Sequence, residues 1–80
     1  MNKKLILEDI ESLIEKEEFL KIGQKTTVCL LTLKNGFEIV TTSSCIYPND
    51  YNHDLGIIYS RKRAIDKLWE LAGYMHHQNN

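Results

Sequence analysis

Two apolar runs rich in β-branched residues lie within residues 26–44, on either side of the Lys-Asn-Gly sequence at residues 34–36. Asn-Gly between two such runs is a strong signal for a β-hairpin. A two-residue loop would mix apolar and polar side chains on both faces of the hairpin. A three-residue loop with Gly36 in the left-handed conformation places Leu33 opposite Phe37 instead and sorts the faces. We therefore expect the three-residue loop.

The three-residue loop gives the hairpin one strongly apolar face and one mixed face. The first, which we expect to pack on the rest of the chain, consists of Cys29, Leu31, Leu33, Phe37 and Ile39. The second carries Val28, Leu30, Thr32, Glu38, Val40 and Thr42. The second face is more apolar than a sheet face in water requires, which favours self-association.

Apolar residues recur at helical spacing on both sides of the hairpin. Residues 7–16 predict an amphipathic N-terminal helix with acidic side chains in its first turn. Residues 19–22 alternate, which fits either a short edge strand or the last turn of that helix. A turn cluster at residues 48–52 precedes a proline-free helical pattern from about His53 to His76. Within that long helix, Gly73 is an alternative end point.

The long helix has an apolar arc that covers nearly half of its circumference. The arc contains Ile57, Ile58, Ala64, Ile65, Leu68, Trp69, Leu71, Ala72 and Met75. Contact with one sheet face needs a narrower arc, so we expect part of it to meet the N-terminal helix or a second subunit. These patterns predict an α+β fold with an N-terminal helix, a central antiparallel β-hairpin or three-stranded sheet, and a long C-terminal helix packed on one sheet face.

Length and composition bound the protein's class. Eighty residues with a net charge of −1 predict a single domain, residues 1–80, with no general attraction to nucleic acid or membrane. The N-terminus lacks the apolar run of a signal peptide or membrane span, so we expect a cytoplasmic protein in which Cys29 and Cys45 are unpaired thiols. A domain this small buries little surface, so we also expect a homo-oligomer, at least a dimer.

The candidate binding residues lie on the long helix. Arg61 falls inside the apolar arc, where a guanidinium either reaches a carboxylate, phosphate or carbonyl or extends along its stem to solvent. Arg61, Lys62, Arg63 and Lys67 form the basic cluster of the chain, with Tyr59 on the same turn. Such a cluster can contact phosphate, although basic residues on a helix usually just face water. The set of candidate binding residues is Arg61, Tyr59, Arg63, Lys67 and Trp69.

Catalytic and metal-binding patterns are missing from the sequence. The three histidines and two cysteines lack the pair spacings of a zinc site. Asp50, His53 and Asp54 are explained by turn formation and helix capping. We therefore expect no enzyme activity, no metal and no cofactor.

Four stretches of the sequence resemble a small phage protein family known by gene products 49 and 66. They are TVCLLTLKNGF at residues 27–37, Tyr-Pro-Asn at 47–49, Leu-Gly at 55–56 and AIDKLWELAGY at 64–74. The resemblance covers about residues 10–75 and implies a phage or prophage origin, expression in the cytoplasm of a bacterial host, and no catalytic residues to carry over. Small phage proteins of this type are often accessory or counter-defence factors that bind a host protein or sequester a nucleotide signal, which is an argument by association.

Two functions from different classes compete. The first is a noncatalytic oligomeric phage accessory protein that acts by binding. The alternative is a nucleic-acid-binding module, because the order of helix, strands and helix is similar to the αβββα double-stranded RNA binding domain. Such domains need a basic face that spans the grooves, whereas acidic residues outnumber lysines in the first helix here. Nucleic acid is therefore the weaker expectation.

Overall fold

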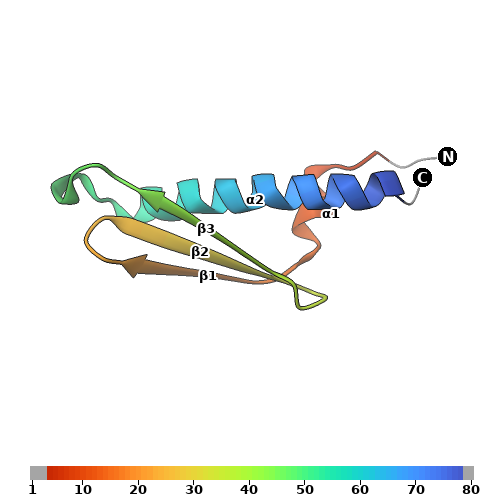
Figure 1. Cartoon of the computed structure of the whole chain (residues 1–80), viewed down its shortest axis with the longest axis horizontal. Helices are drawn as coiled ribbons and strands as arrows, with labels where there is room; N and C mark the ends of the chain where they lie inside the picture. The colour runs from red at the N-terminus through yellow and green to blue at the C-terminus, as the bar shows by residue number, and fades with distance from the viewer. Residues whose placement is uncertain (1–3, 79–80) are drawn as a thin grey trace.

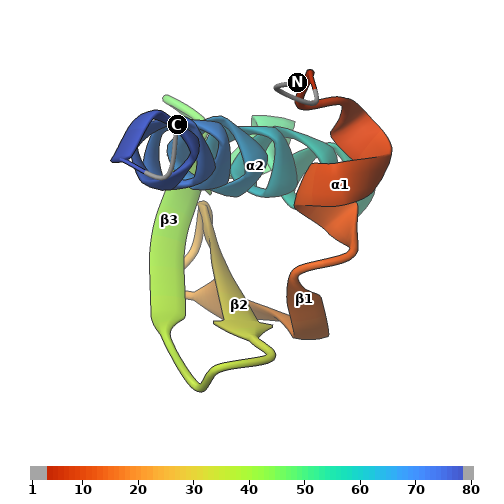
Figure 2. The ribbon, with the colours of Figure 1, turned by 90° about the vertical axis from the view of Figure 1, so that its right-hand side faces the viewer.

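A computed structural model describes residues 4–78. The elements in chain order are α1 (Leu7–Glu11), β1 (Ile14–Ile22), β2 (Thr26–Leu33), β3 (Glu38–Ser44), the short 3-10 helix η1 (Pro48–Asp50) and α2 (His53–Gln78) (Figure 1). The strands form an antiparallel sheet in the order β1-β2-β3. Both α-helices lie on the same side of this sheet (Figure 2). The expected α+β arrangement is confirmed, and its sheet is three-stranded.

The loop between β2 and β3 is the three-residue loop expected from the side-chain alternation. The backbone N–H of Leu33 donates to the carbonyl of Phe37 at 2.8 Å, and the N–H of Gly36 donates to the carbonyl of Leu33 at 2.9 Å. Gly36 has φ +91°, a conformation that L residues with a side chain rarely adopt. The strand register then continues through Thr32 opposite Glu38. The hairpin prediction is confirmed in both loop type and register.

β1 differs most from the sequence-based expectation. A helix over residues 7–16 is wrong beyond Glu11, because β1 already begins at Ile14. Residues 19–22 belong to this nine-residue strand, so the edge-strand alternative is confirmed. The glutamates and lysines of this stretch favour a helix locally, but pairing with β2 outweighs that preference. An irregularity in the register between Ile14 and Lys16 also interrupts the alternation by which a strand is recognised.

The hydrophobic core lies between the inner face of the sheet and α2. Its buried residues are Ile10, Cys29, Leu31, Leu33, Ile39, Ala64, Ile65 and Leu68. Ile10 brings α1 into this core, so the expected contact between the long helix and the N-terminal helix is confirmed. Phe37, expected on the packed face, is 53% exposed because it lies beyond the last buried pair at the hairpin tip.

α2 approaches the sheet closely along a row of small residues, Gly56, Ser60 and Ala64, all of which are buried. The hydroxyl of Thr41 donates to the Ser60 carbonyl at 2.6 Å, and the Ser60 hydroxyl donates to the Gly56 carbonyl at 2.7 Å. Thr27, buried in β2, lies directly beneath Gly56. The helical wheel placed Ala64 in the apolar arc but missed Gly56 and Ser60, because it ranks residues by hydrophobicity and glycine and serine score low.

Local chemistry explains where α2 begins, whereas its end differs from one of the two sequence-based expectations. The Asn52 side chain accepts a hydrogen bond from the Leu55 N–H at 3.1 Å, as expected of a capping residue in the turn cluster. The alternative end at Gly73 is wrong, since the helix continues to Gln78. Overall the chain is elongated, with principal extents of 52 × 20 × 17 Å, and the last turns of α2 extend past the hairpin tip (Figure 1).

Two glycines in α2 should respond oppositely to alanine. A Cβ at position 56 would lie 2.9 Å from the Thr27 Cβ and closer still to its hydroxyl, so Gly56→Ala should lower the free energy of unfolding by about 1–3 kcal/mol. A Cβ at position 73 would meet nothing within 4 Å, so Gly73→Ala should raise it by about 0.5–1 kcal/mol through helix propensity alone. Urea unfolding of both variants measures this. The same sign for both would contradict the close contact at Gly56.

Candidate functional site

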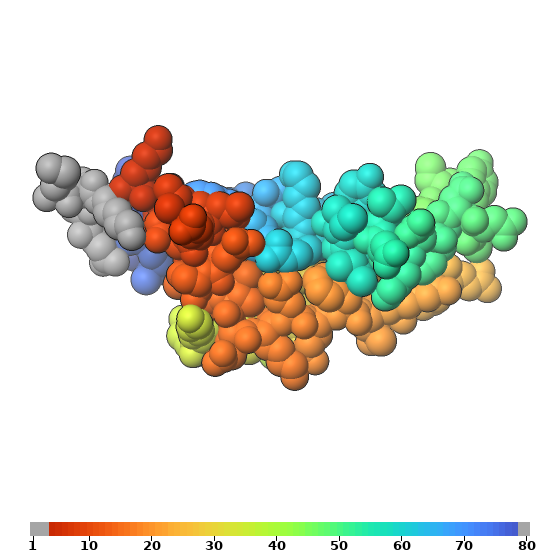
Figure 3. All heavy atoms as spheres, turned by 180° about the vertical axis from the view of Figure 1, so that it is seen from behind, coloured from red at the N-terminus to blue at the C-terminus, as the bar shows by residue number. Residues whose placement is uncertain are grey.

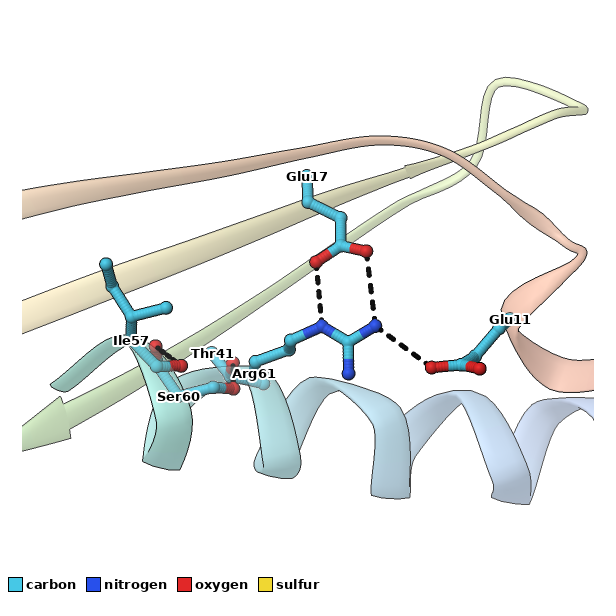
Figure 4. A network of polar contacts seen from close by, with 6 residues as sticks. All are labelled: Glu11, Glu17, Thr41, Ile57, Ser60 and Arg61. Atoms are coloured by element: carbon cyan, nitrogen blue, oxygen red, sulfur yellow. Dashed lines mark hydrogen bonds and ion pairs between the residues drawn. The ribbon is translucent and has the colours of Figure 1, made fainter. Parts of the chain in front are cut away.

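Arg61 is held between two carboxylates from other parts of the same chain (Figure 4). Its Nε lies 2.8 Å from Glu17 Oε1 and its Nη2 lies 3.2 Å from Glu17 Oε2, a two-pronged contact with β1. The same Nη2 lies 3.2 Å from Glu11 Oε2 at the end of α1. Two expectations were stated for Arg61, and the first is confirmed: its guanidinium reaches carboxylates.

This ion cluster joins three elements at a partly buried place. The side chains of Arg61 and Glu17 are 34% and 31% exposed, so water screens their attraction less than at an open surface. Hydrogen bonding to Glu17 raises the pKa of the Arg61 guanidinium, and burial opposes this rise only in part. Arg61 therefore stays cationic at any physiological pH, and its role within the chain is to fix α1 and β1 against α2.

An apolar groove of about 700 Å³ opens beside this cluster, at the end of the molecule where α2 extends past the hairpin. Three elements supply its apolar walls: Ile10 and Leu13 from α1 and the turn after it, Leu33 and Phe37 from the hairpin tip, and Leu71 and Met75 from α2. From behind, α1 and the hairpin tip lie next to each other at this end of the molecule (Figure 3). The backbone N–H of Lys34 donates to the Leu13 carbonyl at 2.9 Å and fixes these two walls together.

The groove keeps large apolar side chains in contact with water. Leu13, Phe37, Leu71 and Met75 are 41–55% exposed. Its volume and its mainly apolar lining are typical of sites that take a ligand or a partner side chain. The groove could not be recognised from the sequence, because the groove forms where three segments far apart in the chain converge. Its only sequence signal was the excess width of the apolar arc of α2, to which Leu71 and Met75 belong.

The other candidate binding residues are spread along α2. Arg63 donates from Nη1 to the Thr42 carbonyl of β3 at 2.8 Å, whereas Arg61 binds β1, so the two arginines reach opposite edges of the sheet. Tyr59 is 52% exposed and lines a hollow of about 140 Å³ near the start of α2. Trp69 is partly buried against the core, and Lys67 is exposed. The five residues therefore do not converge on one place.

The cysteines and histidines form no cluster in the described part of the chain. Cys29 is fully buried in the core, where desolvation raises the pKa of its thiol, which disfavours a nucleophilic thiolate. Cys45 is half-buried, and its thiol donates to the Tyr47 carbonyl at 3.1 Å. Among residues 4–78, no three His, Cys, Asp or Glu side chains lie where they could together hold a metal ion. No helix within these residues is long and apolar enough to cross a bilayer.

A double-mutant cycle should show that Arg61 and Glu17 are coupled. Arg61→Met keeps an apolar stem and removes the fork, and we expect a coupling free energy with Glu17→Gln of about 1–2 kcal/mol in urea unfolding. The matched control is the pair Lys62 and Asp66, 3.2 Å apart but 72% and 59% exposed, where we expect less than about 0.5 kcal/mol. Equal coupling in the two pairs would show that the cluster has no special role in joining α1 and β1 to α2.

One of three comparisons with known proteins found a match. Searches of the curated proteins and of the solved structures returned no match. Residues 5–79 match the sequence profile described as the phage protein (N4 Gp49/phage Sf6 gene 66) family. This match spans nearly the whole chain, including all three groove walls and the Arg61 cluster, and it confirms the resemblance of the hairpin and of the end of the long helix. The chain therefore belongs to the phage protein family of N4 Gp49 and phage Sf6 gene 66.

Proposed function

We propose that this phage protein is a noncatalytic accessory factor that acts by binding, as a homo-oligomer, and that its groove receives an apolar segment of a host protein. The observation that carries the proposal is the groove itself. It exposes Leu13, Phe37, Leu71 and Met75 side by side on a protein of only 80 residues. Apolar side chains gathered in a concave site are typical of surfaces that another molecule covers.

The lining of the groove favours a protein segment over a nucleotide signal. A nucleotide needs cationic or backbone donors for its phosphates. Lys34 is the only lysine or arginine among the described residues that line the groove. Arg61, the best phosphate ligand nearby, is already bound by Glu11 and Glu17. An amphipathic helix that inserts an apolar face is the better fit to such walls.

The charge around the groove suggests which residues should flank that segment. α1 forms one wall, and Glu8 and Asp9 in its first turn are acidic, whereas Glu11 at its end is paired with Arg61. Acids at the rim of an apolar site favour partners that carry lysine or arginine beside their apolar residues, and they speed the encounter of such partners. We therefore propose a partner segment with an apolar face and basic flanks.

Binding of nucleic acid has less support. The element order αβββα is shared with double-stranded RNA binding domains, but the basic residues of α2 are largely engaged within the chain. Arg61 and Arg63 bind opposite sheet edges, and Lys62 pairs with Asp66. A groove-spanning basic face is therefore missing from the described part of α2.

Site-specific photo-crosslinking in bacterial host cells tests the groove. A photoreactive residue in place of Met75 should form an adduct with one host protein, and the same residue in place of Lys62, on the solvent side of α2, should not. Leu71→Asp should reduce the Met75 adduct at least tenfold with only a small change in melting temperature, because Leu71 is 42% exposed. Identical adducts from both positions would contradict the proposal. So would a copurified nucleotide in native mass spectra without any protein adduct.

A further inference from the structure

Both faces of β1 are mixed in polarity. The covered face holds Phe19, which packs against the core, but also two charged residues. Glu17 and Lys21 lie in the rows of buried Leu31 and Thr27, and so belong to the face that α2 covers. Leu20 and Ile22 belong to the opposite face and are 61% and 52% exposed. A strand with one face in water normally places its apolar side chains toward the core. These two exposed aliphatic side chains indicate that another molecule covers the outer face of the sheet.

The outer face is an apolar patch with charges at one end. Its apolar residues are Leu20, Ile22, Val28, Leu30 and Val40. Val40 is 57% exposed, although it lies in the middle of β3. Beyond the patch, one row of the sheet runs Lys16, Thr32, Glu38, so that a cation on one edge strand and an anion on the other are level with each other.

We propose that this outer face docks onto the same face of a second copy of the chain, with the twofold axis along β2. This deepens the oligomeric part of the proposed function and is independent of the groove, which lies on the helix side of the sheet. Two facing sheets lie about 10 Å apart with their strands nearly aligned. A twofold axis along β2 places β1 of each copy over β3 of the other. Lys16 of each copy then faces Glu38 of the second copy, and the two opposite-charge contacts are equivalent by symmetry.

The other face-to-face arrangement is disfavoured by the same residues. A twofold axis perpendicular to the strands would place β1 over β1 in reverse. Lys16 would then lie over Ile22 and Glu18 over Leu20, so that charges would be buried against aliphatic side chains. With the axis along β2, Glu18 lies over Val40 of the second copy, while Lys16, to which Glu18 is already paired at 3.5 Å, faces Glu38. One charged residue of β1 rather than two is then placed over an aliphatic side chain.

The size of the patch sets the strength of the contact. Three strands about 4.8 Å apart, each about seven residues long, offer a flat footprint of roughly 300–400 Å² per copy. The two copies together would bury roughly 600–800 Å², less than the about 1,000 Å² of a stable specific interface, so the association should be weak or transient. We therefore expect a dimer with a Kd of about 1–100 μM, visible by sedimentation equilibrium or light scattering across that range.

Val40 and Ile58 supply a matched pair of variants for the patch. Both are 57% exposed, but Val40 lies on the outer face and Ile58 lies on α2. Val40→Glu should raise the dimer Kd at least tenfold, and Ile58→Glu should leave it within twofold. Thermal melts of both variants check that the fold is retained. Equal effects of the two substitutions, or a monomeric protein up to 500 μM (about five times the weakest Kd expected), would overturn the docking proposal.

Charge reversal tests the symmetry axis. Lys16→Glu alone and Glu38→Lys alone should each raise the homodimer Kd by about tenfold or more, because like charges then face each other twice. An equimolar mixture of the two variants should form a heterodimer at least as tight as the wild type, because every contact is then between opposite charges. This preference should weaken in 1 M salt. A mixture no tighter than the separate variants would overturn the arrangement along β2.

The two proposals fail in distinguishable ways. Absence of any host-protein adduct at position 75 in the otherwise wild-type protein, with the dimer intact, would overturn the groove and leave the docking face. An unchanged dimer in Val40→Glu, with the adduct intact, would overturn only the outer face as the site of self-association.

Discussion

The close contact between α2 and the sheet is the constraint on which the other features depend. Gly56, Ser60 and Ala64 recur every fourth residue and present little side-chain bulk to β2 and β3. Backbone carbonyls of this row accept hydrogen bonds, including one from the buried Thr41 hydroxyl. Where the helix and the sheet nearly touch, hydrogen bonds thus take the place of contacts between large side chains. Of the larger apolar residues of α2, Ile65 and Leu68 lie in the core. Others, such as Ile58, Leu71 and Met75, lie at its sides or far end and are 42–57% exposed.

The Arg61 cluster helps to hold α1 in place. A helix of five residues is too short to be stable alone, and it gains stability only by packing. Ile10 anchors α1 in the core, and Glu11 ties its end to Arg61, which also binds Glu17 of β1. Arg61 thus fixes α1 and β1, which have weak secondary-structure preferences of their own, against α2. The wall of the groove that α1 forms is held in place by the same contacts.

The elements that depend on local sequence patterns could be predicted. The Lys-Asn-Gly loop and its register follow from alternation over a few residues, and the long helix follows from a periodic pattern without proline. The prediction failed at β1, because a run of glutamate and lysine has helical preference and only pairing with β2 makes it a strand.

The site was harder to predict than the fold, because it depends on contacts between residues far apart in the chain. The partners of Arg61 are 44 and 50 residues away in the chain, so its position in the apolar arc indicated that it needed an anion without showing which one. The groove joins three segments, and no single pattern contains it. Gly56 and Ser60 were overlooked because a helical wheel weighs hydrophobicity, whereas here small size determines which residues face the sheet.

The two outer strands also determine how copies of the chain can meet. The free edge of β1 runs through Glu15, Lys16, Glu17 and Glu18, and its register is irregular near the start. On β3, Arg63 occupies the carbonyl of Thr42. Charged or occupied edges resist the strand-by-strand addition that builds fibrils. The protein would thereby avoid open-ended polymers, in which strands are added without limit, at both edges of its sheet.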